Sequence, residues 1–326
     1  MSTVGVRRAM VLAGGLTFER DVSLRSGRRV ADALRHVGVE VDLRDADSTL
    51  MTELVEHPPE AAFIALHGGP GEDGAIRGVL ELAEVPYVGA SAHACRMAFD
   101  KPTAKALLRA AGLATPDWVT LPQETFRELG AHAVMDALLN HLTLPLVVKP
   151  ARGGSALGVT VVESAEALPA AMVHCFSYGD TALVERHVQG MELGISIIDE
   201  ATPSGSAPRA LPPVEIVPKE GVFDYDARYT AGATDYFVPA RLDTTVLVAA
   251  QDAALRAHQV LGLRDLSRTD LMVSPDGTPW ILEVNVAPGM TETSLLPMAA
   301  AAADLDLGEL CKSALSRAMN RSGRSR

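Results

Sequence analysis

The segment that decides the fold lies near the carboxyl end of the chain and reads Leu266-Ser-Arg-Thr-Asp-Leu-Met-Val-Ser-Pro-Asp-Gly-Thr-Pro-Trp-Ile-Leu-Glu-Val-Asn285. Its Asp276-Gly277 pair is preferred in two-residue type I′ turns, and apolar residues alternate on both sides, so we expect a β-hairpin. With such a turn, Asp270 lies opposite Glu283. Opposed Cβ atoms are roughly 4.5–5.5 Å apart, so the two carboxylates would face each other, which is costly unless a cation lies between them.

Two further polar residues share this face of the predicted hairpin. Arg268 lies opposite Asn285, and both point the same way as Asp270 and Glu283 because side chains alternate between faces. Oxygen ligands of this kind suit Mg²⁺ or Mn²⁺, and an arginine beside the ion indicates a ligand with negative charge, such as phosphate. The next segment, Pro288–Ser294, can supply backbone N–H groups and a helix start for an anion. An exposed hairpin with a solvated polar face would show the same alternation.

The composition restricts the class of protein. A chain of 326 residues with 48% hydrophobic residues is expected to form two or three compact domains. A formal net charge of −12 argues against nucleic acid or an anionic membrane surface as a partner. The cysteines Cys95, Cys175 and Cys311 are far apart and form no zinc or disulfide pattern. No apolar run approaches the ~20 residues that span a bilayer, so we expect a cytoplasmic protein.

The first hundred residues alternate between strand and helix. Strands are expected at Arg8–Ala13, Val39–Leu43 and Ala61–Leu66, and a helix capped by Ser23 is expected to run to about His36. This β-α-β order predicts a parallel sheet with helices on its faces. Ligands of such sheets bind at the carboxyl ends of the strands.

Two loops fall at that edge of the predicted sheet. The first follows the Arg8–Ala13 strand and contains Glu19, which could also be an ordinary surface residue before a helix. The second, His67-Gly-Gly-Pro-Gly-Glu-Asp-Gly74, holds four glycines in eight residues. So many glycines would let the backbone approach a small ligand, with His67 at the strand tip.

The middle of the chain carries two lysines and a glycine-rich loop. Lys101 opens a helix that runs to about Ala111, and Thr125–Asn140 is also expected to be helical. Lys149 ends a short strand and precedes the loop Gly153–Gly158. A flexible hairpin of this kind can close on phosphates through its N–H groups, although a plain glycine turn would look the same.

The last third is expected to contain a lid and a closing helix. Glu185 and Glu192 lie on two strands, and Glu192 could hydrogen-bond ribose hydroxyls at the edge of a nucleotide pocket. Residues 219–237 have no sustained period and carry tyrosines and an arginine, as a lid would. Residues 244–262 form an amphipathic helix, and residues 295–317 are expected to close the C-terminal domain as one helix, followed by a disordered tail.

Together these features resemble the ATP-grasp ligases, and within them the D-alanine–D-alanine ligase family. The matching segments occur in family order from about residue 8 to 310 and are Gly14–Leu24, His67–Gly78, Asp100-Lys101, Val148–Pro150 with Gly154-Ser155, Tyr225–Tyr229 and Glu283–Thr291. The resemblance implies an α/β ATP-grasp fold of three domains. These would be an N-terminal Rossmann-like domain with a parallel sheet (1–100), a central subdomain with the flap (101–182) and a C-terminal subdomain with the metal hairpin and lid (183–326).

The resemblance also implies roles for individual residues. ATP would be held by Lys101, Lys149, Gly154, Ser155, Glu185 and Glu192. Two Mg²⁺ ions, or Mn²⁺, would be bound by Asp270, Glu283 and Asn285. The tetrahedral centre would be stabilised by Arg268 and the Gly289 backbone. The amino acid substrates would contact Glu19, His67, Arg228, Ser294 and Leu295. A hydrogen-bonded triad would join Glu19, Ser155 and Tyr229.

The implied activity is ATP-dependent joining of two D-alanines through an acyl phosphate, for peptidoglycan, by a homodimer. Four positions depart from the usual family pattern: Arg77, Ala156, Arg228 and Val286. Arg228 stands where lysine is usual, near the expected carboxylate of the second substrate, and the exchange keeps the charge but alters its geometry. A paralogous amide ligase that joins other amino acids in specialised metabolism is therefore an alternative. A nucleotide-binding regulatory protein without catalysis is another, against which the complete set of metal ligands argues.

Overall fold

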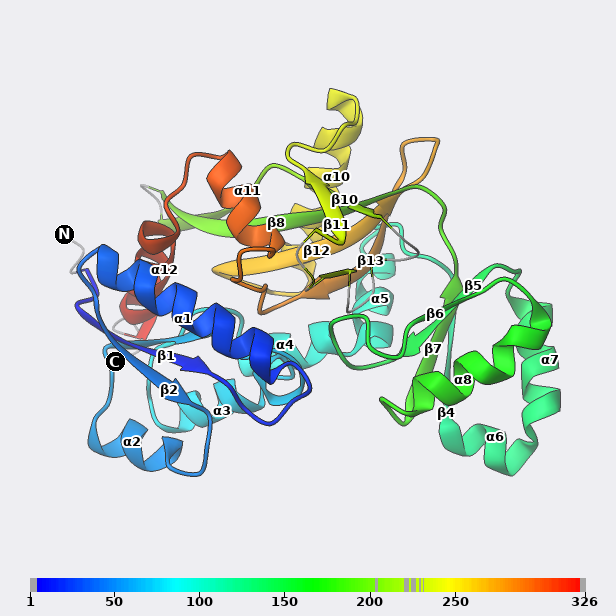
Figure 1. Ribbon diagram of the computed structural model, residues 1–326, viewed down its shortest axis with the longest axis horizontal. Coiled ribbons are helices and arrows are strands. Elements are labelled where there is room, and N and C mark those ends of the chain that lie inside the picture. Colours follow the sequence, from blue (N-terminus) through cyan, green and yellow to red (C-terminus); the bar gives the residue numbers. More distant parts are fainter. Residues whose placement is uncertain are drawn as a thin grey trace.

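Three β-sheets, each with its own helices, surround a common centre in the computed structural model (Figure 1). The residues that the structure describes are 5–202, 205–219, 223, 227–228, 230 and 232–322. The lid residue Tyr229, for which a role was predicted, lies outside them.

The first sheet is parallel, as predicted, with the strand order β2-β1-β3. Its strands are β1 (Arg8–Ala13), β2 (Glu40–Asp45) and β3 (Ala61–Ile64). Its helices are α1 (Arg20–His36), α2 (Leu50–Glu56) and α3 (Ala75–Leu82), with a 3-10 turn at Gly69–Gly71. Ser23 does not cap α1, contrary to the prediction: it is buried inside the helix, and its Oγ donates to the Ala65 carbonyl and accepts from Gly14 N. Glu19 occupies the cap position.

The second sheet is antiparallel and has the strand order β4-β7-β5-β6. Its strands are β4 (Trp118–Pro122), β5 (Leu146–Pro150), β6 (Thr160–Val162) and β7 (Thr181–Arg186). Its helices are α6 (Gln123–Leu129), α7 (Ala131–His141) and α8 (Leu168–Phe176), preceded by a 3-10 turn at Ala165–Ala167. The single helix expected over 125–140 is broken at Gly130, which adopts a φ of +88°. Between the first two sheets the chain forms α4 (Ala92–Phe99) and α5 (Lys101–Ala110), the latter capped by Asp100.

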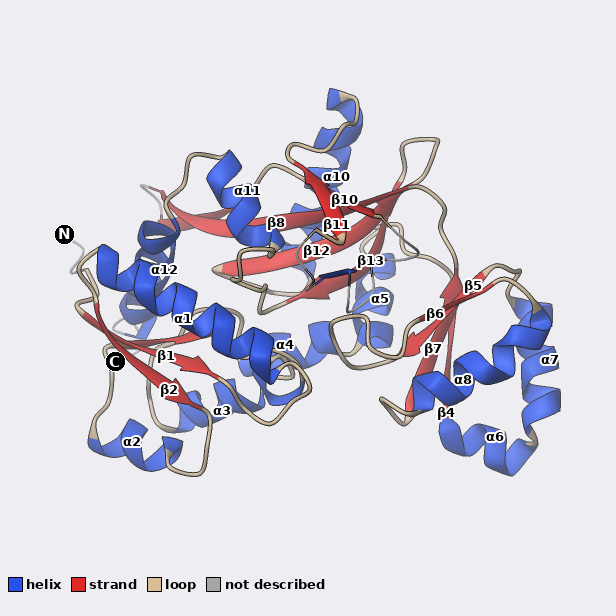
Figure 2. Cartoon of the chain, in the orientation of Figure 1, coloured by secondary structure: helices blue, strands red, loops and turns tan. Residues whose placement is uncertain are grey.

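The third sheet contains the predicted hairpin. Its main path is β11-β10-β8-β12-β13, and β9 pairs with the far end of β8. Its strands are β8 (Met191–Thr202), β9 (Gly205–Ala210), β10 (Val214–Pro218), β11 (Thr234–Phe237), β12 (Leu266–Val273) and β13 (Pro279–Asn285). Helix α10 (Thr244–Val260) packs against β8, β9, β12 and β13. Figure 2 shows this sheet lying above the first sheet and beside the second.

The hairpin has the predicted register at the site, although the predicted turn is wrong. Gly277 N donates to Ser274 O at 2.8 Å, and Ser274 N donates to Thr278 O at 3.0 Å, so the loop has one residue more than a type I′ turn. A β-bulge then shifts the register between Asp270 and Leu271, because Leu282 is an extra residue on β13. The two offsets cancel, so Asp270 lies opposite Glu283, and Arg268 lies opposite Asn285.

The carboxyl-terminal helix also differs from the prediction. Two helices, α11 (Leu295–Ala302) and α12 (Leu307–Ser322), replace the single one expected, and α12 extends well beyond the predicted start of the disordered tail. Helix α11 packs on the third sheet, whereas α12 returns to the first sheet and packs against α1 and β3 (Figure 1). One hydrophobic core therefore joins the start and the end of the chain. Among the described residues, no helix has both the length and the apolar composition needed to cross a membrane.

Candidate active site

Two adjoining cavities lie where the three sheets meet. The first lies between the first and third sheets, and the second lies between the second and third. Their common wall includes Lys101, Gly153, Gly154, Arg228 and Glu283. All predicted site residues that the structure describes line one cavity or the other. The first cavity also contains Glu19, His67, Ser155, Arg268, Asn285, Gly289, Ser294 and Leu295; the second also contains Lys149, Glu185, Glu192 and Asp270.

The hairpin carboxylates are neutralised by neighbouring cations. Arg268 donates to both oxygens of Asp270, at 2.6 and 2.7 Å, and Lys101 Nζ lies 3.6 Å from Glu283. Burial raises the pKa of Glu283, but the positive charges of Lys101 and Arg228 outweigh it and lower the pKa to about 2. Glu283 is therefore ionised at neutral pH.

The oxygen atoms at the hairpin form an incomplete set of metal ligands. Asp270, Glu283 and Asn285 offer two carboxylates and one amide, and Asn285 Oδ1 also accepts from Ala287 N at 2.8 Å. Within the described part of the chain, no three His, Cys, Asp or Glu side chains form a group that could hold a metal. Magnesium is typically bound by one or two carboxylates together with substrate phosphates, so this set fits an ion that arrives with a nucleotide.

Hydrogen bonds attach the glycine-rich loop Gly153–Gly158 to Glu19, just before α1, and to Lys101, the first residue of α5. Ser155 Oγ donates to Glu19 Oε1, and Lys101 Nζ donates to the Gly153 carbonyl at 2.6 Å. Ser155 has a φ of +51°, a conformation that few residues other than glycine adopt. Burial raises the pKa of Glu19, although the hydrogen bond from Ser155 and the charge of Lys101 oppose this. Two of the three predicted triad residues are thus in contact, and the third is Tyr229.

A buried lysine that the sequence analysis missed contacts Glu185 in the wall of the second cavity. Lys105 Nζ lies 2.7 Å from Glu185 Oε2 and 2.7 Å from Thr115 Oγ1, while Lys149 Nζ lies 2.5 Å from Glu185 Oε1. Burial raises the pKa of Glu185, but the two lysines outweigh it, and the pKa is lowered. Both oxygens of Glu185 already have cationic partners, so it holds Lys149 in place. Lys105 follows Lys101 by one helical turn. This spacing places both lysines on the same face of α5 and could have indicated a role for Lys105 from the sequence.

Glu192 lies in the same cavity in a different electrostatic environment. Burial raises its pKa to about 7, with Arg228 opposing and Asp270 reinforcing the shift. A carboxyl group poised in this way can both donate and accept hydrogen bonds near neutral pH.

His67 is neutral and has a buried partner. Burial lowers the pKa of His67 to about 4, although a hydrogen bond to the Ala287 backbone acts to raise the pKa. Its Nε2 lies 2.9 Å from Ser26 Oγ, which also accepts from Met290 N at 3.1 Å. Ser26 was not predicted, and through it the histidine is linked to the segment that follows the hairpin. His67 therefore holds backbone in place as well as lining the first cavity.

Glu72 is a second residue that the sequence analysis missed, although it lies in the glycine-rich segment quoted there. It is buried in the wall of the first cavity and accepts from Gly68 N at 3.1 Å. Burial, reinforced by the charge of Glu19, raises the pKa of Glu72 to about 8. Its carboxyl group is therefore protonated at neutral pH.

The segment after the hairpin is closely packed around Gly289. A Cβ atom on Gly289 would lie 2.6 Å from Ser294 Oγ, so a side chain there would displace Ser294. Ser294 Oγ accepts from Thr291 N at 2.9 Å, and Arg29 from α1 donates to the Met290 carbonyl at 3.3 Å. Gly289, Thr293 and Ser294 of this segment line the cavity that also contains Arg268.

Comparisons with known proteins agree with this arrangement. Family models described as "D-ala D-ala ligase C-terminus" and "D-ala D-ala ligase N-terminus" match residues 107–316 and 44–90. The chain is 42% identical to a D-alanine–D-alanine ligase of Anaeromyxobacter dehalogenans, over 96% of this chain and 97% of the relative. It is 39% identical to that of Aquifex aeolicus, over 93% and 98%.

Solved structures give the same match. The D-alanine–D-alanine ligase of Bacillus anthracis superposes with a TM-score of 0.83 at 30% identity, over 98% of this chain and all of the other. The same enzyme complexed with ATP gives a TM-score of 0.79 at 29% identity, over 99% of this chain and all of the other.

Proposed function

The chain belongs to the D-alanine–D-alanine ligase family, and we propose that it uses ATP to join two D-alanine molecules into D-alanyl-D-alanine for peptidoglycan. The observation that carries this proposal is the common wall of the two cavities. Lys101, Arg228 and Glu283 border both, so a nucleotide in the second cavity would direct its terminal phosphate toward an amino acid in the first.

The chemistry starts from a carboxylate, which is a poor electrophile for an amine. Transfer of the γ-phosphoryl group to the carboxylate of the first D-alanine forms an acyl phosphate and releases ADP. The amine of the second D-alanine then attacks the acyl carbon, and phosphate leaves with its bonding electron pair. Arg268 and the N–H groups around Gly289 would stabilise negative charge on the tetrahedral centre.

The two substrates would occupy opposite ends of the first cavity. Glu19 is placed to accept a hydrogen bond from the ammonium group of the first amino acid, with His67 nearby. Arg228, Ser294 and Leu295 would contact the second, and the guanidinium group of Arg228 would face its carboxylate. The hydrogen bond between Ser155 and Glu19 would keep the glycine-rich loop over the reacting atoms and exclude water.

Asp270, Glu283 and Asn285 would hold two Mg²⁺ ions, or Mn²⁺. Bound Mg²⁺ would supply positive charge to the oxygens of the transferred phosphoryl group. Arg268 now pairs with Asp270, and this pair would have to open before Asp270 could bind a metal. Lys101 and Lys149 would contact the nucleotide phosphates, Glu192 the ribose and Glu185 the adenine.

The test is a screen of ADP release with pairs of D- and L-amino acids, in which each product is identified by mass. We expect ADP to form with D-alanine alone, to require Mg²⁺, and to accompany a dipeptide of two D-alanines. ADP release with another pair and none with D-alanine would support the paralogous ligase instead. No ADP release with any pair would support a regulatory role.

Two further features belong to this proposal. We place the reaction in the cytoplasm, where ATP is available and where three free, buried cysteines would remain reduced. The homodimer also stays a prediction, which the molecular mass in solution would test.

A further inference from the structure

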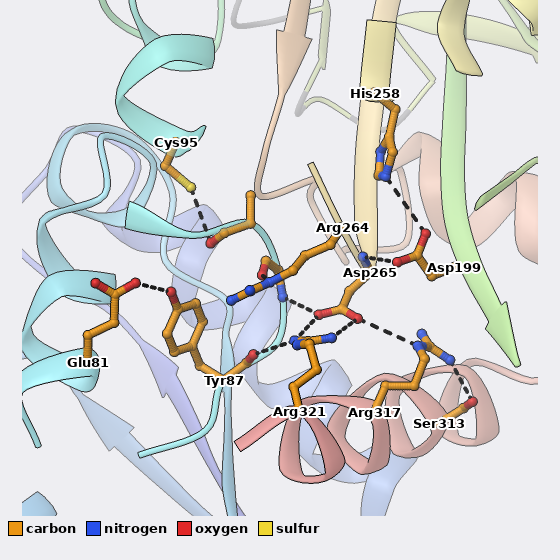
Figure 3. A network of polar contacts seen from close by, with 12 residues as sticks. Glu81, Tyr87, Cys95, Asp199, His258, Arg264, Asp265, Ser313, Arg317 and Arg321 are labelled. Carbon is orange, nitrogen blue, oxygen red and sulfur yellow. Dashed lines mark hydrogen bonds and ion pairs between the residues drawn. The ribbon is translucent and has the colours of Figure 1, made fainter. Parts of the chain in front are cut away.

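A buried carboxylate outside both cavities gathers contacts from distant parts of the chain. Asp265 is fully buried and has a φ of +63°. Arg321 donates to both of its oxygens at 2.7 Å, Arg317 Nε lies 3.5 Å away, and Gly89 N donates to it at 2.8 Å (Figure 3). A buried carboxylate with this many partners holds them in one geometry, because losing any one leaves charge uncompensated.

The contacts around Asp265 join the first sheet, the third sheet and the last helix. Arg321 lies at the end of α12 and also donates to the carbonyl of Tyr87 at 3.1 Å, and Tyr87 forms an isolated β-bridge with Ala62 of β3. Arg264 Nε donates to the Gly89 carbonyl at 2.7 Å. Asp265 N donates to Asp199 on β8 at 2.8 Å. Gly89 is thus held through its N–H and its carbonyl by two successive residues immediately before β12.

The Asp265 network continues on one side to the glycine-rich segment after β3. Gly74 ends the segment that starts at His67, and it packs so closely on the Ala92 backbone that a Cβ would lie 2.3 Å from the Ala92 carbonyl oxygen. Ala92 N and Tyr87 Oη both donate to Glu81 Oε1, at 3.3 and 2.5 Å. The segment with Gly89 and Ala92 therefore supports the loop that carries His67 and Glu72.

On its other side the network leads directly into β12. Arg268 and Asp270 follow Asp265 by three and five residues on that strand. His258 on α10 lies 3.8 Å from Asp199 through Nε2 and 2.7 Å from Ser267 Oγ through Nδ1. The start of β12 is thus fixed against β8 and α10 as well.

We propose that Asp265 and Arg321 are positioning residues that hold the His67–Gly74 loop at a fixed place relative to Arg268 and Asp270. They touch neither substrate. This inference rests on the proposed function, because it assumes that the first amino acid binds between that loop and β12. ATP would bind in the second cavity, which the His67–Gly74 loop does not line, and Asp270 on its wall is also held by the pairing of β12 with β8 and β13.

The first experiment uses Asp265→Asn. Asparagine tolerates a positive φ and can still accept from Gly89 N, but it leaves Arg321 and Arg317 without a counter-charge. We expect kcat/KM for D-alanine to fall by about tenfold or more, because ångström-scale misplacement of reacting groups can cost 10²-fold. The Kd for ATP, measured by calorimetry, should not change. Arg321→Gln should behave similarly, and Arg321→Lys should restore part of the activity because it restores the charge.

Lys312→Ala is the matched control. Lys312 Nζ donates to the Val37 carbonyl at 2.8 Å, so this variant loosens α12 from α1 without touching Asp265. It should lower the melting temperature but leave kcat/KM for D-alanine unchanged. Asp265→Asn and Arg321→Gln with wild-type kcat/KM would overturn the proposal. So would an equal loss in the Lys312→Ala variant at a matched change in melting temperature.

Amide hydrogen exchange provides a measurement that does not depend on the substrate. Asp265→Asn and Arg321→Gln should speed exchange in residues 67–74, and Lys312→Ala should not. If the wild type makes no dipeptide from D-alanine but exchange in 67–74 responds as stated, the proposed function fails and the positioning role stands. Unchanged exchange in both Asp265 and Arg321 variants would refute the positioning role itself.

Discussion

Individual side chains around the cavities hold charge states that burial and neighbouring charges determine together. Burial raises the pKa of Glu72 to about 8 and lowers that of His67 to about 4, so both are neutral at pH 7. Glu283 is also buried, yet Lys101 and Arg228 lower its pKa to about 2. Glu283, one of the three residues expected to bind metal, is thus stabilised in its charged form.

The first prediction concerns Glu283→Gln, which preserves shape and removes a metal-binding charge. Turnover at saturating Mg²⁺ should fall by at least about 100-fold, because even residues behind a metal ligand cost 10–100-fold when replaced. The melting temperature should fall modestly, since Lys101 loses its partner. Steady-state ADP release and thermal unfolding measure the two effects. Near-normal turnover would mean that the metal site lies elsewhere.

The second prediction concerns Glu72→Gln and pH. The pKa of Glu72 in the folded protein, about 8, exceeds the ordinary value of 4.5. The folded state therefore binds the proton more tightly, and this stabilisation is complete below about pH 4.5 and is lost as pH rises through about 8. Glutamine resembles the protonated carboxyl group and does not titrate. The stability of the Glu72→Gln variant should therefore not show this decrease as pH rises.

Thermal unfolding of the ligand-free protein between about pH 5 and pH 9 tests this effect. The melting temperature of the wild type should drop relative to that of Glu72→Gln as pH rises. Glu56→Gln, which changes an exposed carboxylate on α2, is the control and should follow the wild type. Parallel curves for all three proteins would contradict the raised pKa.

Sequence patterns identified residues whose neighbours are close in sequence and missed those whose neighbours are distant. Asp270 and Glu283 were placed correctly on one hairpin because they are close in sequence. The role of Lys105 was missed because its partner Glu185 lies 80 positions away. Burial of Glu72 likewise depends on the first and third sheets meeting, which no local pattern reports.

At the level of elements, the hairpin and the glycine-rich segments set where the side chains point. The β12–β13 register was predicted from a turn that does not occur, and it holds because the longer loop is compensated by the bulge at Leu282. The alternation of polar and apolar residues alone cannot detect a bulge, because the extra residue is inserted into only one of the two paired strands. The alternating pattern therefore identified the hairpin, whereas the agreement in pairing at the site results from two offsets that cancel.

The third prediction compares two glycines of the same region. Gly74→Ala places a methyl group against the Ala92 carbonyl at a φ of +91°, and should lower the free energy of unfolding by at least ~1–2 kcal/mol from the backbone conformation alone. It should also raise KM for D-alanine by displacing the loop. Gly78→Ala, with nothing within 4 Å of the new Cβ, should stabilise α3 by about 0.5–1 kcal/mol. Chemical denaturation measures both changes, and equal effects would contradict the close packing at Gly74.

For the whole molecule, the decisive feature is that the chain returns to its starting point. The parallel first sheet and the existence of the hairpin were predictable from periodicity. The return of α12 to α1 was not, because an apolar stripe indicates that a helix is buried but not against which surface. Division of the chain after residues 100 and 182 stays a prediction, and limited proteolysis with mass spectrometry would test it.

The central claim is that ATP activates the carboxylate of one amino acid for attack by the amine of another. Transfer of ¹⁸O from D-alanine labelled in its carboxylate tests this most directly. We predict that ADP, phosphate and D-alanyl-D-alanine form in equal amounts, and that each phosphate carries one oxygen from the labelled carboxylate. Unlabelled phosphate, or release of AMP and pyrophosphate, would contradict activation through an acyl phosphate.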